Sequence, residues 1–260
     1  MKHGFVALAV ALTVAFAGLT QPCRADMQTG VILMHGKDST ARPMSPVGRL
    51  ASYLRNNFRV ATPDMPWVRD NFLNGTLEQA FAELDSVIAK LKAEGATRIV
   101  VGGHSMGADA ALAYAAEHPG LAGVLMIAPG HRPDIYAPKN VGTLGQARAL
   151  VKAGTPDKTV SVFDINTGKR GYRDVRADAA LSWFDPDGPM VMQNSARKLA
   201  PGTPVLFIIG KEDRFHPIGR ELVYDRLPPH PKSAYIVVEG GHKATPVKGR
   251  KQIARWLNGL

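Results

Sequence analysis

Short apolar runs rich in valine and isoleucine alternate along the chain with amphipathic stretches, and this alternation constrains the fold more than any other feature. Parallel strands joined by crossover helices produce this order. The expected strands are Val31–Met34, Arg59–Thr62, Ile99–Gly102, Gly123–Ile127, Val205–Ile209 and Tyr235–Val238. The expected helices are Pro46–Asn56, Thr76–Glu94, Ser105–His118, Ile218–Arg226 and Val247–Leu257. The sequence therefore predicts an α/β fold in which helices flank a mostly parallel sheet of about six strands.

One segment, residues 130–202, interrupts the alternation. A structureless loop of that length is rare in a compact domain. Helical patterns at Leu144–Lys152, Ala177–Trp183 and Val191–Leu199, with a strand pattern at Val160–Phe163, indicate secondary structure within the segment. Open α/β sheets bind ligands at the carboxyl edge of their strands. We therefore expect a small cap-like insertion over that edge.

The N-terminus has the pattern of a secretory signal peptide. Lys2 and His3 precede an uncharged apolar run, Gly4–Leu19, and a small residue, Ala25, follows shortly after. The run is shorter than the ~20 residues that a membrane span needs, although an uncleaved anchor is the alternative. We expect cleavage after Ala25, a periplasmic or secreted protein, no stable membrane span after cleavage, and a single α/β domain over residues 26–260.

The composition limits which kinds of functional site we expect in the chain. Cys23, the only cysteine, would leave with the signal peptide, so we expect no disulfide, thiol nucleophile or cysteine metal site. The net charge of +10 favours contact with anionic envelope surfaces. However, the basic residues are scattered, which argues against a nucleic-acid site. Because metal-binding, phosphate-binding and dinucleotide motifs do not occur, we expect neither a metal nor a cofactor.

A serine stands where a strand should turn sharply into a helix. The motif Gly103-His104-Ser105-Met106-Gly107 follows the predicted strand Ile99–Gly102 and leads into an alanine-rich stretch. Such a turn exposes the hydroxyl, and the small flanking residues allow strand and helix to approach each other. Ser105 is therefore a candidate nucleophile, and a tight turn without chemistry is the alternative.

A serine nucleophile needs a base and an orienting carboxylate. Asp213 follows the strand Val205–Ile209, and His242 follows the strand Tyr235–Val238. Because the carboxyl ends of parallel strands share one edge, we expect both side chains near Ser105. Glu212 is the alternative carboxylate. Since the base must be neutral to accept the serine proton, we expect activity to fall in acid.

These motifs resemble those of the serine-nucleophile α/β-hydrolases, the esterase, lipase and thioesterase group. The resemblance rests on Leu33-Met34-His35-Gly36, the Ser105 motif, the turn from Gly210 to Pro217, and Gly241-His242. It implies a catalytic triad of Ser105, Asp213 and His242. It also implies an oxyanion hole formed by the backbone N–H groups of Met106 and Lys37.

The activity that the resemblance implies is hydrolysis of an ester or thioester of a small-molecule or lipid-like acyl group. Acyl transfer or amide and peptide cleavage would use the same residues, and a non-catalytic binding protein of this fold is the alternative from another class. The residues expected to line the substrate pocket are Gly36, Trp67, His131, Arg132 and His216. With Lys37, the basic members of this set favour an anionic substrate.

Overall fold

The computed structural model describes residues 1, 27–69 and 73–260. The predicted signal peptide therefore lies almost entirely outside the described residues. Six parallel strands form the central sheet in the order β2-β1-β3-β4-β7-β8. Their bounds are β1 Thr29–Met34, β2 Arg59–Ala61, β3 Arg98–His104, β4 Gly123–Ile127, β7 Val205–Gly210 and β8 Ala234–Val238. The predicted α/β fold and its mostly parallel six-stranded sheet are confirmed.

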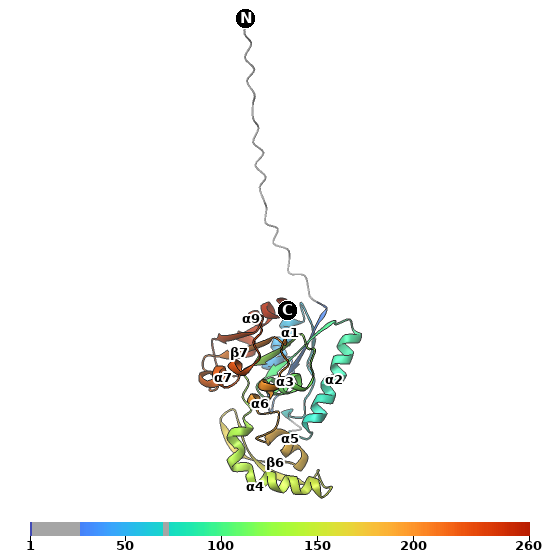
Figure 1. Cartoon of the computed structure of the whole chain (residues 1–260), viewed down its shortest axis with the longest axis vertical. Coiled ribbons are helices and arrows are strands. Elements are labelled where there is room, and N and C mark those ends of the chain that lie inside the picture. Colours follow the sequence, from blue (N-terminus) through green and yellow to red (C-terminus); the bar gives the residue numbers. More distant parts are fainter. Residues whose placement is uncertain (2–26, 70–72) are drawn as a thin grey trace.

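Helices cover both faces of this sheet (Figure 1). Alternate residues of β1 separate into two cores, with Ile32 and Met34 on one face and Val31 and Leu33 on the other. The first core includes side chains of α2 (Leu77–Ala93) and α3 (Met106–Glu117). The second includes side chains of α1 (Pro46–Leu54) and α9 (Arg250–Asn258). Strands buried on both faces have to be apolar throughout, which explains their continuous apolar runs.

Local signals set the ends of two helices. The Thr76 side chain accepts a hydrogen bond from the Gln79 N–H while the Gln79 side chain accepts one from the Thr76 N–H, a capping box that begins α2. Ser45 caps α1, where Pro46 occupies the first turn. Two short helices complete the C-terminal part, α7 (His216–Leu222) and α8 (Thr245–Lys248), together with a 3₁₀ turn at Tyr224–Arg226.

The segment between β4 and β7 has its own secondary structure. It contains α4 (Pro133–Lys152), a two-stranded antiparallel hairpin of β5 (Thr159–Asn166) and β6 (Lys169–Arg176), α5 (Ala177–Phe184) and α6 (Met192–Lys198). In Figure 1, α4, β6 and α5 gather at the end of the molecule opposite the C-terminus. The β4–β7 segment is therefore well placed to cover one edge of the sheet.

Two elements of this segment differ from the sequence-based prediction. The first helix begins at Pro133, well before the predicted Leu144, although Pro138 lies inside it. Strand β6 was not predicted, because it is rich in charged residues and mostly exposed. It pairs with β5 over eight residues, from Thr159 opposite Arg176 to Asn166 opposite Lys169. Among the described residues, no helix is both long and apolar enough to cross a membrane.

Candidate active site

Ser105 lies between the end of β3 and the start of α3 in a strained backbone conformation. Its φ of 56° and ψ of −126° are rarely adopted by residues other than glycine. The Ser105 N–H donates to the Ile127 carbonyl of β4 over 3.0 Å, and the Ser105 carbonyl accepts from the Ala108 N–H over 2.8 Å. These bonds hold the turn in place, so the strain is maintained by the surrounding fold.

The glycines on either side of Ser105 are required by close backbone approach. A Cβ atom on Gly103 would lie 2.5 Å from the Gly107 carbonyl carbon. A Cβ atom on Gly107 would lie 2.6 Å from the His35 carbonyl oxygen. Contacts this short to backbone cannot be relieved by a rotamer change. The G-x-S-x-G pattern therefore follows from the packing of β3, α3 and the end of β1 against one another.

The buried Asp213 carboxylate and the partly exposed His242 imidazole form a hydrogen-bonded pair. The Asp213 Oδ2 atom lies 2.7 Å from His242 Nδ1. Burial alone would raise the pKa of Asp213, but the hydrogen bond and charge of His242, with the N–H of Phe215, lower that pKa below its usual value. Asp213 is therefore held as a carboxylate, which favours the His242 tautomer that carries its proton on Nδ1 and leaves Nε2 free to accept one.

The turns that carry these two residues are joined by backbone hydrogen bonds. Lys211 N–H donates to the Val238 carbonyl over 2.8 Å, and Glu212 N–H donates to the Gly240 carbonyl over 3.2 Å. A Cβ atom on Gly210 would lie 2.2 Å from the Gly240 oxygen, so the two turns pack without space for a side chain. The relative position of acid and base is thus set by the ends of β7 and β8.

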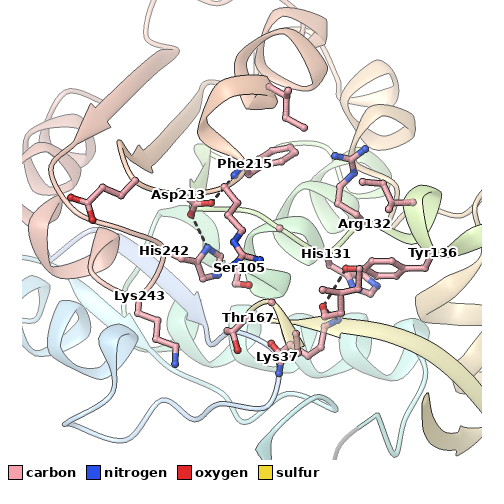
Figure 2. Close-up of a pocket in the computed structure, with 18 residues that line it drawn as sticks. Lys37, Ser105, His131, Arg132, Tyr136, Thr167, Asp213, Phe215, His242 and Lys243 are labelled. Atoms are coloured by element: carbon pink, nitrogen blue, oxygen red, sulfur yellow. Dashed lines mark hydrogen bonds and ion pairs between the residues drawn. The ribbon is translucent and has the colours of Figure 1, made fainter. Parts of the chain in front are cut away.

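Ser105, Asp213 and His242 line one cavity of about 420 Å³. A Cβ atom placed on Gly130 would lie 3.4 Å from His242 Cε1 and 4.0 Å from Ser105 Oγ, so the imidazole and the hydroxyl border the same space. Figure 2 shows the three side chains in succession, with Lys37 and Lys243 around the same opening. The volume suits a small organic molecule.

The backbone expected to form an oxyanion hole also lies beside Ser105. Met106 is the first residue of α3, where helix N–H groups have no acceptor within the helix. A Cβ atom on Gly36 would lie 3.2 Å from Ser105 Cβ, so the chain at Gly36-Lys37 passes directly over the serine. The N–H groups of Met106 and Lys37 thus belong to segments that both touch the serine turn.

The Lys37 side chain connects this turn to the β5–β6 hairpin. Lys37 Nζ donates to Asp164 Oδ1 over 2.5 Å, and both side chains are almost completely buried. Burial lowers the pKa of the Lys37 ammonium, although the Asp164 carboxylate opposes this effect. The same ammonium lies 5.6 Å from the centre of the Tyr136 ring. One residue therefore links the sheet edge to two elements of the β4–β7 segment.

Trp67 does not line the cavity, contrary to the sequence-based prediction. Its side chain is completely buried. The indole N–H donates to the His35 carbonyl over 2.8 Å, and the ring packs edge-on against Trp183. The His35 imidazole, whose pKa burial lowers, accepts from the Met65 N–H and donates to the Gly36 carbonyl. Trp67 and His35 thus hold the loop after β1 in position.

The other predicted pocket residues divide into two groups. His131 and Arg132 line the cavity, whereas Gly36 and His216 are not among the residues that line it. Burial lowers the pKa of His131 to about 3, so its imidazole is neutral, and Nε2 donates to the Trp183 carbonyl. His216 begins α7, and its N–H donates to the Asp213 carbonyl.

The sequence-based prediction missed the part of the cavity that the β5–β6 hairpin supplies. The hairpin turn, Asn166-Thr167-Gly168, lines the cavity together with Tyr136 of α4 and Phe215. Thr167 and Gly168 both have positive φ, as a two-residue hairpin turn requires. An Asn-Thr-Gly sequence after the apolar run at Val160–Phe163 is a turn signal that could have revealed the hairpin.

The described part of the chain contains no cluster of potential metal ligands. Across residues 27–69 and 73–260, no group of three or more histidine, cysteine, aspartate or glutamate side chains is arranged to hold an ion. The arrangement at Ser105 combines a hydroxyl that lines the cavity, an imidazole and a buried carboxylate, which is the set that nucleophilic acyl chemistry uses.

Comparison with known families agrees with this geometry. The model of the alpha/beta hydrolase family matches residues 31–255, which is most of the chain. The chain belongs to the alpha/beta hydrolase family. No similar sequence was found among curated proteins.

Several solved structures share the fold of this alpha/beta hydrolase. A monoacylglycerol lipase from Paleococcus ferrophilus has 20% identity and a TM-score of 0.64, with 88% of this chain and 94% of the lipase covered. Est1E from Butyrivibrio proteoclasticus has 15% identity and a TM-score of 0.59, covering 90% and 87%. The thioesterase domain from the curacin biosynthetic pathway has 14% identity and a TM-score of 0.54, covering 90% and 92%. At sequence identities of 20% or lower, this structural similarity establishes the shared fold alone.

Proposed function

We propose that this alpha/beta hydrolase cleaves an ester or thioester through an acyl-enzyme on Ser105. The observation that carries the proposal is the 2.7 Å Asp213–His242 pair opening onto the same cavity as the strained Ser105 turn. Structural neighbours described as a lipase and a thioesterase domain support this class of substrate. The cavity accommodates a small acyl compound.

The proposed reaction has two halves. His242 Nε2 takes the Ser105 hydroxyl proton while Oγ attacks the substrate carbonyl carbon, and the N–H groups of Met106 and Lys37 stabilise the oxyanion. The alcohol or thiol then leaves with the proton from His242. Water next gives a proton to His242 and attacks the acyl carbonyl. The bond to Oγ then breaks, and His242 returns the proton to Oγ, which releases the acid and regenerates Ser105. Asp213 stays ionised and stabilises the transient imidazolium.

A panel of p-nitrophenyl esters and matched thioesters of graded acyl length tests the proposal. We expect Ser105→Ala to lower kcat by at least roughly 10⁴-fold, because removing a triad member leaves only binding and oxyanion stabilisation. Ser86→Ala, which alters an exposed serine on α2, is the matched control and should retain wild-type kcat. Equal rates for wild type and Ser105→Ala would reject the proposal, and the absence of any turnover would favour a binding protein.

A further inference from the structure

In the folded protein, two of the basic residues that the sequence associated with an anionic substrate are paired with carboxylates, and a third is neutral. Lys37 is paired with Asp164. Arg132 makes a bidentate contact with Asp134, over 2.8 Å from Nε and 2.5 Å from Nη2. His131 is neutral, because burial lowers its pKa to about 3. Recognition of an anion therefore has to come from other residues of the cavity.

Arg214 is a cation that reaches across the opening of the cavity. It follows Asp213 in the chain, yet its guanidinium lies against the turn of the β5–β6 hairpin. A Cβ atom on Gly168 would lie 2.8 Å from Arg214 Nη1 and 3.2 Å from Nη2, so the guanidinium lies in contact with this turn. Gly168 also has a φ of +85°. The exposed Arg214 side chain therefore lies beside the hairpin turn, where Arg214 and the turn both line the cavity.

No acidic side chain of the described residues pairs with this guanidinium. Each ion pair of the described residues joins other side chains, so no carboxylate of these residues competes for the Arg214 guanidinium. Lys243, which directly follows His242, is a second exposed cation of the lining and makes no ion pair within the part of the chain that the structure describes. Glu212 is the exposed carboxylate of the same rim. Two free cations against one free carboxylate leave the rim positive.

The rest of the opening is apolar. Ile135 of α4 and Ile218 of α7 are about half exposed, at 54% and 47%, and both line the cavity with Phe215. Exposed isoleucines and a guanidinium in the lining of one cavity match a compound that has a hydrocarbon part and a negatively charged end. A purely hydrocarbon acyl chain would offer the Arg214 guanidinium no acceptor, whereas a carboxylate would.

We propose that Arg214, assisted by Lys243, binds a carboxylate carried by the substrate, so that the substrates are esters or thioesters of dicarboxylic acids. This inference rests on the proposed function. The hydrocarbon chain of the acid would lie along Ile135, Phe215 and Ile218, with the scissile carbonyl at Ser105. The guanidinium supplies two parallel N–H donors, the geometry that a carboxylate prefers.

A matched pair of esters tests the inference. Mono-p-nitrophenyl adipate is compared with p-nitrophenyl 6-methylheptanoate, in which an isopropyl group replaces the carboxylate, after subtraction of uncatalysed hydrolysis. We expect the ratio of kcat/KM for the charged ester to that for the neutral one to fall at least roughly tenfold in Arg214→Ala. Arg214→Lys should restore part of the ratio.

Lys211→Ala is the matched control, because it removes an exposed cation from the same turn without altering the cavity lining. An unchanged ratio in Arg214→Ala, or an equal fall in Lys211→Ala, would overturn the inference while leaving Ser105-dependent hydrolysis intact. If neither ester is hydrolysed, the proposed function fails, and titration calorimetry of adipate with Ser105→Ala and Ser105→Ala/Arg214→Ala still decides the inference. Equal affinity of the two proteins for adipate would overturn it.

Discussion

At the scale of single residues, the site depends on which carboxylate faces His242. The sequence left Asp213 and Glu212 as alternatives. In the structure Asp213 is buried and bonded to His242 Nδ1, whereas the neighbouring Glu212 is exposed. The turn that begins at Gly210 directs the adjacent side chains of Glu212 and Asp213 to opposite sides. Asp213 therefore lies in the interior, whereas Glu212 is exposed to solvent.

Substitution of the two carboxylates distinguishes their roles. Asp213→Asn should lower kcat by roughly 10³- to 10⁴-fold, because the amide favours the wrong His242 tautomer and cannot stabilise the imidazolium. Glu212→Gln should retain most of the kcat for a neutral p-nitrophenyl ester. Steady-state kinetics with circular dichroism as a folding control measures both. A larger loss in Glu212→Gln than in Asp213→Asn would assign the acid to the other residue.

The serine turn gives a second prediction at this scale. Gly107→Ala places a Cβ atom 2.6 Å from the His35 carbonyl oxygen, which requires a backbone shift. We expect a loss of about 1 to 3 kcal/mol in the free energy of unfolding, together with reduced activity. Gly142→Ala is the control, because no atom lies within 4 Å of the added methyl group in α4. It should be neutral or stabilising by up to about 1 kcal/mol in urea unfolding.

At the scale of elements, the sequence was most informative where burial is most complete. The six strands and the helices α1, α2 and α3 were predicted within a few residues. Strands β1, β3, β4 and β7 are buried on both faces and are therefore continuously apolar, and the amphipathic helices have a clear period. Strand β6 and the first half of α4 were missed. Charged residues dominate Lys169–Arg176, and Pro138 with Gly142 weakens the helical pattern of α4.

The same reasoning explains which site residues could be predicted. Ser105, Asp213 and His242 follow directly from strand ends, so their shared edge could be inferred from the strand order. Trp67 also follows a strand, yet its loop folds inward and buries the ring. The charges of Lys37 and Arg132 are neutralised by Asp164 and Asp134. Lys37 and Asp164 are far apart in the sequence, and a local sequence pattern does not predict contacts over such a separation.

The Lys37–Asp164 pair gives the prediction for the hairpin. Asp164→Asn leaves a buried ammonium without a counter-charge, so we expect a loss of roughly 3 kcal/mol in the free energy of unfolding and a lower kcat. The double variant Lys37→Met/Asp164→Leu removes both charges and should recover most of the stability. Urea unfolding measures the free energy of unfolding of the single and the double variant for comparison with wild type.

The exposed pair Arg148–Asp185 provides the control for this experiment. Its side chains are 54% and 28% exposed, and Asp185→Asn should cost less than about 1 kcal/mol. A cost for Asp164→Asn as small as that for Asp185→Asn would show that the buried pair does not anchor the hairpin.

At the scale of the whole molecule, buried neutral histidines couple stability to pH. The pKa of His104 is lowered to about 3, chiefly by burial, and then by the charge of His242. Lys243 lowers it further, whereas Asp213 and the hydrogen bond to the His242 carbonyl oppose the change. Between the ordinary value of 6.5 and this value, the unfolded chain binds a proton at His104 that the folded protein does not. Stability must therefore decrease as the pH falls through that range.

His104→Gln isolates this effect, because the amide can still donate to the His242 carbonyl and does not titrate. His131 is retained in both proteins, so its similar contribution cancels. We expect the stability difference to move in favour of the variant by about 1.4 kcal/mol for each pH unit below roughly 6.5. Urea unfolding at a series of pH values measures it. A difference that stays constant with pH would contradict the assignment of His104 as buried and neutral.

The central claim is that the whole fold serves to activate one hydroxyl, that of Ser105. Labelling with a fluorophosphonate, followed by intact-mass and peptide mass spectrometry, tests this claim most directly, because the reagent requires an activated serine and no knowledge of the substrate. We predict one adduct, located on Ser105, absent from Ser105→Ala and strongly slowed in the His242→Ala variant. An unlabelled wild-type protein, or an adduct that persists in Ser105→Ala, would contradict the account.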